Sequence, residues 1–298
     1  MLVKSSKKKS SVIIGTHEVT ISNSGKIFWK EEIITKGELI EYYQEICPII
    51  LPYIKNRPQS LHRFPDGISG KSFYQKDVSH LNLPKWIKTK NIHASSSEKS
   101  TKYLVCDNCE SVIYMINLGC IEIHPWSSKI DHLNYPDWIT IDLDPFDVSF
   151  RTVVTVAIEL NKLLTELKIK SFCKTSGASG MHIYIPLHQS LNYEEAKKTA
   201  YHYAMLLHEK FPDITSLERI PAKRKGKVYL DYLQNNKGQT LAAPYSVRPF
   251  PNAPVSAPLY WDEIDDNLDK NQFTIKTMLN RINKTGDVWK DFFNTKNS

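Results

Sequence analysis

The chain has 298 residues, of which 41% are hydrophobic and 24% charged, and 39 Lys and Arg residues against 32 Asp and Glu residues give a formal net charge of +7. This composition is typical of a soluble globular protein and excludes a wholly disordered chain. The longest apolar stretch, 46–54, contains two prolines and is far shorter than the roughly 18 residues that a membrane span needs. Since no signal-peptide core follows the basic N-terminus, we expect a cytoplasmic protein without a membrane partner.

In chain order, we expect a basic flexible tail over 1–14, followed by a single domain over 15–298. A helix is predicted from Leu39 until Pro48 and Pro52 interrupt it. The polar segment 88–102 is predicted to be a loop, and the alternation of apolar residues in 138–144 predicts a strand.

In the second half of the chain, segments with the apolar spacing of helices alternate with segments that have the apolar alternation of strands. Apolar residues at three- and four-residue steps from Val153 predict one helix. Asn192 followed by Glu195 is the pattern of a capping box and predicts the start of a second helix, which runs to about 211. Strands are predicted at 181–185 and 227–233, an extended coil at 245–258 and helical periodicity at 273–293. We therefore predict a mixed α/β domain with one central sheet.

Five cysteines form an odd and sparse set, which argues against a disulfide framework and favours reduced thiols. Cys106 and Cys109 have the spacing of half a zinc site, but no second pair with ligand spacing follows, so buried free cysteines are the simpler interpretation. The positive charge weakly favours a polyanionic partner, although many metabolic enzymes carry a similar charge.

Two carboxylates lie on one face of the strand predicted at 138–144. Asp142 and Asp144 are two residues apart, and Asp231 stands in another apolar strand where an unpaired charge is costly. Three such acids could hold two divalent ions, the arrangement that serves phosphoryl transfer. The alternative is that the pair only ends a strand.

A loop rich in glycine and serine follows Lys174 and leads to His182. Its backbone amides could face phosphate oxygens, and Arg248 could pair with a phosphate. The alternatives are an ordinary turn, a core histidine and an arginine paired with a carboxylate.

Together these residues closely resemble the polymerase domain of bacterial DNA ligase D, a member of the archaeo-eukaryotic primase superfamily that acts in non-homologous end joining. The resemblance covers about residues 15–293. Its motifs, in chain order, are Arg63-Phe-Pro-Asp-Gly67, Phe73-Tyr-Gln-Lys76, His124-Pro-Trp126, Asp142-Leu-Asp-Pro145, Lys174-Thr-Ser-Gly-Ala-Ser-Gly-Met-His182, Asp231-Tyr-Leu-Gln-Asn235 and Val247-Arg-Pro249.

The resemblance implies an archaeo-eukaryotic primase-like fold, with a mixed or antiparallel central sheet flanked by helices. It implies that the family's metal-binding acids fall on Asp142, Asp144 and Asp231, and that two ions, Mn²⁺ or Mg²⁺, bind there. It also implies a pocket for NTP or dNTP at the following positions: His124, Ser176, Gly177, His182 and Arg248. Many relatives carry a lysine where this chain has Ser179, so one phosphate contact is missing or is supplied elsewhere.

For DNA, the resemblance implies that Lys26 and Lys36 hold the 5′-phosphate of an end or gap. Phe73 and Tyr74 resemble aromatics that stack on a template base, with core packing as the alternative. Three cations that precede the strand of Asp231, at 223–225, would sit beside the active site as a hairpin tip and hold primer phosphates, unless they only solubilise a loop. These three are Lys223, Arg224 and Lys225.

The expected function is thus template-directed nucleotide addition to 3′-hydroxyl ends at DNA breaks or gaps, with a preference for ribonucleotides that only the resemblance implies. Ku and a separate ATP-dependent DNA ligase are its expected partners. Two alternatives remain: a primase that starts chains de novo, and a non-catalytic module that binds DNA ends through its charge.

Overall fold

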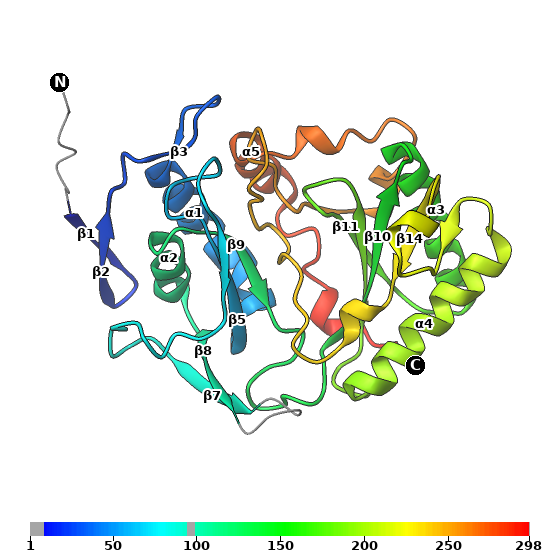
Figure 1. Ribbon diagram of the computed structural model, residues 1–298, viewed down its shortest axis with the longest axis horizontal. Helices are drawn as coiled ribbons and strands as arrows, with labels where there is room; N and C mark the ends of the chain where they lie inside the picture. Colours follow the sequence, from blue (N-terminus) through cyan, green and yellow to red (C-terminus); the bar gives the residue numbers. More distant parts are fainter. Residues whose placement is uncertain (1–8, 94–98, 298) are drawn as a thin grey trace.

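The structure is a computed structural model (Figure 1), and it describes residues 9–93 and 99–297. Within these residues, two larger β-sheets and five α-helices form the framework. The central sheet has six strands in the order β13-β14-β10-β12-β11-β15. Neighbouring strands within this sheet are antiparallel, except that β13 and β14 are parallel. The strands span Trp138–Phe146 (β10), Phe172–Thr175 (β11), Met181–Pro186 (β12), Thr215–Ser216 (β13), Lys227–Asp231 (β14) and Pro258–Leu259 (β15).

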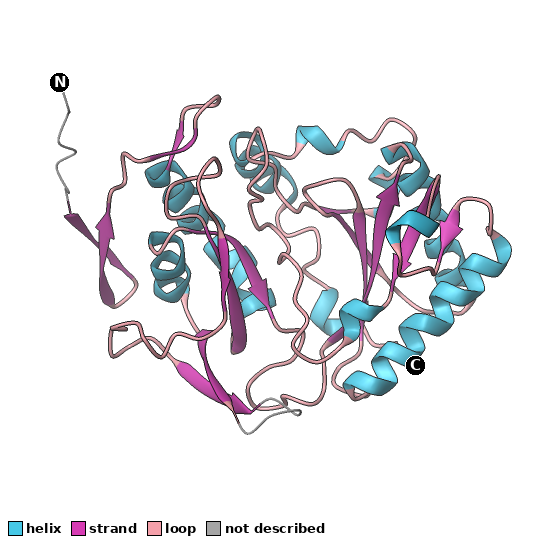
Figure 2. Ribbon diagram, in the orientation of Figure 1, coloured by secondary structure: helices cyan, strands magenta, loops and turns pink. Residues whose placement is uncertain are grey.

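Two amphipathic helices, α3 (Phe150–Glu166) and α4 (Tyr193–Lys210), pack on β10. Figure 2 shows both helices beside the strands of this sheet. The predicted capping box is confirmed, since Asn192 accepts from the backbone N–H of Glu195 and the Glu195 carboxylate accepts from that of Asn192. The expected α/β class, with a mixed central sheet flanked by helices, is confirmed.

A second sheet, which the local sequence patterns do not predict, occupies the N-terminal half. Its order is β6-β5-β8-β7, with β9 also paired to β5. The bounds are Arg57–Arg63 (β5), Phe73–Gln75 (β6), Thr89–His93 (β7), Ser100–Cys106 (β8) and Cys120–Pro125 (β9). Helices α1 (Lys36–Ile54) and α2 (Cys109–Asn117) pack against each other and against β9. One buried cluster includes residues of both sheets, among them Leu61 and Ile141.

Short elements complete the chain. Two small antiparallel ribbons, β1 (Lys9–Ile14) with β2 (His17–Ser22) and β3 (Ile27–Trp29) with β4 (Ile34–Thr35), precede α1. The 3₁₀ turns are η1 (Pro221–Lys223), η2 (Leu233–Asn235), η3 (Trp261–Glu263), η4 (Lys270–Gln272) and η5 (Phe292–Asn294), and the last helix is α5 (Ile275–Thr285). None of the helices found in 9–93 and 99–297 is long and apolar enough to cross a membrane.

Helix α1 corrects the prediction that two prolines interrupt it. It begins at the capping box of Thr35 and Glu38 and continues past Pro48 and Pro52 to Ile54. A proline inside a helix costs one backbone hydrogen bond and some steric strain. The fully buried face of α1, which includes Ile46 and Ile50, offsets that cost through packing that a local pattern does not reveal.

Other boundaries also differ from the prediction. The segment 88–102 contains β7 and the start of β8, whose polar residues lie on a partly exposed sheet, while 94–98 lies outside the described residues. Residues 9–14 form β1 and so do not belong to a flexible tail, and 1–8 are not described. The strand predicted at 227–233 ends at Asp231, and the helix predicted at 273–293 is confined to α5.

The expectation that all thiols are reduced is wrong for two of the five cysteines. Cys47 on α1 and Cys109 on α2 form a disulfide across 62 residues of sequence, because the two helices pack together. Cys106 does not share a metal site with Cys109, and it is buried and free, as are Cys120 and Cys173 among the cysteines that the structure describes.

Candidate active site

Three carboxylates converge on one face of the central sheet. Pairing of β10 with β14 places Asp142 directly opposite Asp231, and Asp144 follows two residues along β10 on the same face. One oxygen from each carboxylate lies within 4.8 Å of the others. Asp142 is 5% exposed, and the other two are half-buried. The residues expected to form a metal site are therefore brought together.

Burial and mutual repulsion make this cluster unfavourable on its own. Burial raises the pKa of Asp142, and the charges of Asp144 and Asp231 raise it further. The pKa of Asp144 is also raised, by burial and then by Asp231. The buried Oδ1 of Asp142 has no hydrogen-bond partner among the described residues. A divalent cation would relieve both the repulsion and the unpaired oxygen, so these residues fit such an ion.

A polar row continues from the acids across the sheet. His182 on β12 is paired with Asp142, and its Nε2 lies 3.3 Å from Asp142 Oδ1. Its Nδ1 lies 2.7 Å from Nζ of the fully buried Lys174 on β11. Burial lowers the pKa of both Lys174 and His182. We assign a neutral imidazole whose Nδ1 accepts from Lys174 and whose Nε2 carries the proton, close to Asp142 Oδ1 but without a hydrogen bond to it.

Lys174 belongs to one of the family motifs, but the sequence alone does not predict a role for it, because only strand register shows that it faces His182. Its Nζ also donates to the Ala242 carbonyl at 3.0 Å and to Ser256 Oγ at 2.6 Å. These contacts hold the lysine side chain, and through it the imidazole, in one orientation.

The glycine- and serine-rich loop packs tightly between β10 and Arg248. Ser176 Oγ accepts from the backbone N–H of Gly180 at 3.0 Å. A Cβ on Gly177, where φ is +71°, would lie 2.6 Å from Arg248 Cγ, and one on Gly180 would overlap the Leu143 carbonyl oxygen. Only glycine fits at these two positions.

A cation from the C-terminal part of the chain reaches this loop. Lys270 on η4 donates from Nζ to the Ala178 carbonyl. With Gly177 and Ser179, it lines a cavity of about 460 Å³. No local pattern indicates this contact, since 92 residues separate Lys270 from Ala178.

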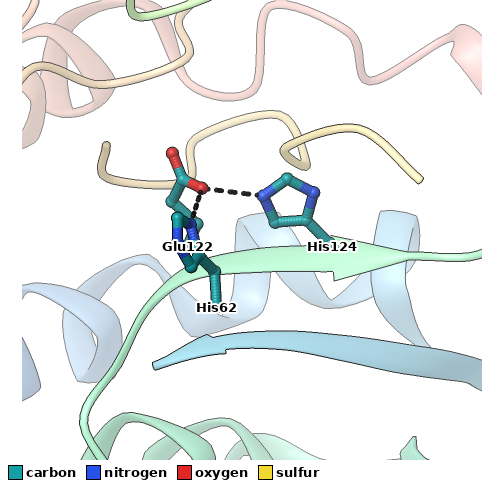
Figure 3. Close-up of side chains that lie close together, drawn as sticks. All are labelled: His62, Glu122 and His124. Carbon is teal, nitrogen blue, oxygen red and sulfur yellow. Dashed lines mark hydrogen bonds and ion pairs between the residues drawn. The ribbon is translucent and has the colours of Figure 1, made fainter. Parts of the chain in front are cut away.

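Two other predicted nucleotide-binding residues meet on Glu122, an acid that sequence reasoning missed. His124 Nε2 lies 2.9 Å from Glu122 Oε2, and Arg248 Nε donates to Glu122 Oε1. His62 Nδ1 lies 2.7 Å from the same Oε2. Figure 3 shows both histidines turned toward the carboxylate. Burial alone would raise the pKa of Glu122, but hydrogen bonds from His124 and His62 and the charge of Arg248 hold it well below its usual range.

The two lysines expected at a DNA 5′-phosphate lie near one another. Pairing of β3 with β4 brings the backbone N–H of Lys36 within 2.8 Å of the Lys26 carbonyl. Burial, followed by the charges of Lys26 and Arg63, lowers the pKa of Lys36 to about 8. Lys36 Nζ donates to Ser22 O at 2.6 Å and to Asn117 Oδ1 at 2.7 Å. Arg63 is thus a third cation close to this pair.

The aromatic pair on β6 is exposed, so the core-packing alternative is wrong. Phe73 is 45% and Tyr74 56% exposed. The Tyr74 ring stacks on His62, with ring centroids 4.1 Å apart and planes 12° apart, and the Arg63 guanidinium lies over Phe73. Both rings therefore offer surface to a ligand while being held from behind.

The segment 223–225 does not form a hairpin tip, because the strands on either side, β13 and β14, run in parallel. Arg224 still lies near the acids: its guanidinium stacks on Tyr229, which pairs with Asp144, and its charge counteracts the raised pKa of Asp144. Lys223 and Lys225 are exposed.

Comparisons of the sequence show similarity to known proteins. The family model described as LigD, primase-polymerase domain, matches residues 35–289. The chain is 31% identical over 288 residues to the multifunctional non-homologous end joining protein LigD of Pseudomonas aeruginosa, covering 94% of this chain and 34% of that protein. It is 34% identical over 270 residues to the bifunctional non-homologous end joining protein LigD of Bacillus subtilis, covering 90% and 43%.

A solved structure is also similar. The polymerase domain from Mycobacterium tuberculosis ligase D in complex with DNA matches with a TM-score of 0.84 at 25% identity, covering 94% of this chain and 99% of that one. The chain thus matches almost all of that domain, while it spans only 34% and 43% of the length of the two curated relatives.

Proposed function

The chain belongs to the family of LigD primase-polymerase domains, and we propose that it extends 3′-hydroxyl ends at DNA breaks or gaps in non-homologous end joining. The observation that carries the proposal is the convergence of Asp142, Asp144 and Asp231 on one face of the sheet, with an unpartnered buried oxygen among them. Nucleotidyl transfer needs such a carboxylate cluster because charge builds up on both the attacking and the leaving oxygens.

We propose that Asp142 and Asp144 would bind two divalent ions and Asp231 one of them, with Mn²⁺ the expected ion and Mg²⁺ the alternative. Bound there, the ions would lower the pKa of the 3′-hydroxyl and neutralise the triphosphate. His182, held by Lys174, keeps its Nε2 3.3 Å from the unpaired Asp142 oxygen and so limits the positions that this carboxylate can take.

The nucleotide would be received by the loop at Ser176 and Gly177 together with His124 and Arg248. Many relatives carry a lysine at the position of Ser179, where it would contact a phosphate. Lys270 supports the proposal because its ammonium group lies at the same loop and could supply that contact. Phe73 and Tyr74 would stack on a template base.

At the other end of the substrate, Lys26 and Lys36 would hold a 5′-phosphate, and Arg63 lies near them. The three cations support recognition of a dianionic end rather than of a continuous backbone, which carries a single charge per phosphate. We also propose Ku and a separate ligase as partners. Residues 15–298 are proposed to form a single domain. The proposed location is the cytoplasm, and the nucleoid when the protein is bound to DNA.

The test is single-nucleotide addition by the wild-type protein to a gap with a downstream 5′-phosphate, compared with a bare single strand. Faster addition at the gap, and with ribonucleotides rather than deoxyribonucleotides, is expected. De novo synthesis on the bare strand without a primer would support the primase alternative, and DNA binding without any nucleotide addition would support the non-catalytic module.

A further inference from the structure

Glu122 is a buried carboxylate on which three segments of the chain meet. It is 2% exposed and accepts hydrogen bonds from His62 on β5, from His124 on its own strand β9, and from Arg248 in the coil after β14. Figure 3 shows Oε2 between the two histidine rings. Oε1 receives the guanidinium, so both oxygens of the carboxylate are used.

Two of the three donors are residues of the proposed nucleotide pocket. Arg248 uses Nε for Glu122 and Nη1 for the Ser176 carbonyl, so the guanidinium is fixed at both ends. His124 uses Nε2 for Glu122, which leaves its buried Nδ1 without a partner among the described residues. When Nε2–H donates to Glu122, this Nδ1 is the acceptor of a neutral imidazole, and within the described part of the free protein it is buried and unpaired.

The third donor leads to the proposed template surface. His62 carries the Tyr74 ring stacked on its own ring at 4.1 Å, and Tyr74 is exposed. Through direct contacts, Glu122 therefore links His62, on which Tyr74 stacks, to His124 and Arg248 of the proposed nucleotide pocket.

The same atoms could also be considered as a metal site, since one ligand atom from each of His62, Glu122 and His124 lies within 4.8 Å of the others. Both histidine nitrogens are already directed at a single oxygen, and Arg248 stands on the other oxygen. A cation there would meet the charge of Arg248 and would cost the carboxylate its two histidine donors. The contacts fit an orienting carboxylate better than an ion site.

We propose that Glu122 is a positioning residue that sets the orientation of His124 and Arg248 for the incoming nucleotide and ties both to the His62–Tyr74 stack. This inference rests on the proposed polymerase function. Hydrogen bonds to a buried charge are among the stronger ones, and removing the charge leaves three donors with one weaker acceptor. The loss should weaken nucleotide binding more than the chemical step, since the contact is made in the ground state as well as in the transition state.

The test is Glu122→Gln, assayed with ATP and Mn²⁺ on a 5′-phosphorylated gap. The KM and the equilibrium Kd for ATP should each rise about tenfold, the effect of losing roughly one charge-assisted hydrogen bond, while kcat changes by less than about threefold. A matched control is Glu110→Gln, which alters another buried glutamate that contacts a histidine, His17 at 3.2 Å, and should leave the KM for ATP unchanged.

A second variant separates positioning from a general loss of folding. In an Arg248→Ala background, Glu122→Gln should raise KM by less than it does alone, because part of its effect passes through Arg248. A wild-type KM in Glu122→Gln would overturn the inference, as would full additivity of the two changes or a matching rise in KM in Glu110→Gln. Failure of the wild-type protein to add any nucleotide would refute the proposed function instead.

Discussion

The two halves of the molecule gather opposite charges for different purposes. On the central sheet, Asp142, Asp144 and Asp231 come together, and burial with mutual repulsion raises the pKa of the first two. In the N-terminal half, Lys36 lies near Lys26 and Arg63, and their charges help to lower its pKa to about 8. The acids repel one another, whereas protein groups already contact the two lysines: Lys26 pairs with Asp66, and Lys36 donates to Ser22 and Asn117. A ligand of opposite charge would be attracted to either cluster. We infer that catalysis and end recognition are built as separable sites.

Removal of the acids should change activity most. Asp142→Ala or Asp231→Ala should reduce nucleotide addition to below a few per cent of the wild-type rate, because the proposed ions lose their ligands, while gap binding is nearly unchanged. A primer-extension assay and a fluorescence anisotropy titration measure the two properties.

The acid variants also carry a control that does not depend on activity. Mn²⁺ should raise the thermal midpoint of the wild-type protein, since a ligand that binds only the folded state stabilises it, and it should raise that of Asp142→Ala less. Extension by either variant above a few per cent of the wild-type rate would contradict the metal assignment.

Removal of the cations of the other half should have a smaller effect, confined to binding. Wild-type protein is expected to bind a gap with a downstream 5′-phosphate several-fold more tightly than one with a 5′-hydroxyl. Lys26→Ala combined with Lys36→Ala should abolish that difference, since two compact ammonium groups then no longer face the dianion. The titrations must share one salt concentration, because screening changes every such affinity. A difference that survives in the double variant would place the phosphate elsewhere.

The lowered pKa of Lys36 makes end recognition dependent on pH. A lysine whose pKa is about 8 in the free protein loses its charge as the pH rises through that value. Because phosphate binds the charged form, the preference for a 5′-phosphate should be largest near neutral pH and fall several-fold between about pH 7.5 and 9. Binding of the 5′-hydroxyl gap should not show this decline, and a preference that stays constant to pH 9 would contradict the role of Lys36.

The segment 223–225 should contribute to DNA binding through its charge alone. Replacing Lys223, Arg224 and Lys225 by alanine should reduce the magnitude of the slope of log affinity against log salt concentration by about 2–3. This is close to one unit for each phosphate that the protein no longer neutralises. An unchanged slope would mean that these cations only solubilise the loop. A smaller slope would show that cations near the acidic cluster also contact DNA phosphates.

The sequence predicts local features well where the signal is local. The strand of Asp142 and the capping box of Asn192 are read from alternation and from residue spacing, and both are confirmed. The convergence of Asp142 with Asp231 needs strand register, yet the cost of a buried acid in each of two apolar strands already indicates a shared site.

Features that depend on packing between distant segments cannot be predicted in this way. Helix α1 passes through Pro48 because its buried face compensates for the missing hydrogen bond, and Cys47 reaches Cys109 only because α1 packs on α2. Glu122 looks like an ordinary strand residue until the pairing of β5 with β9 brings His62 beside it. Such contacts have no counterpart in local periodicity.

Competition between two inactive proteins provides the sharpest test of whether catalysis and end recognition are separate. Asp142→Ala protein is added in increasing amounts to a wild-type extension reaction in which the 5′-phosphorylated gap is limiting. We predict that Asp142→Ala inhibits by occupying the gap, and that adding Lys26→Ala and Lys36→Ala to the same chain raises the protein concentration needed for inhibition several-fold. Equal inhibition by the two proteins, or none by Asp142→Ala, would contradict the separation of the two sites.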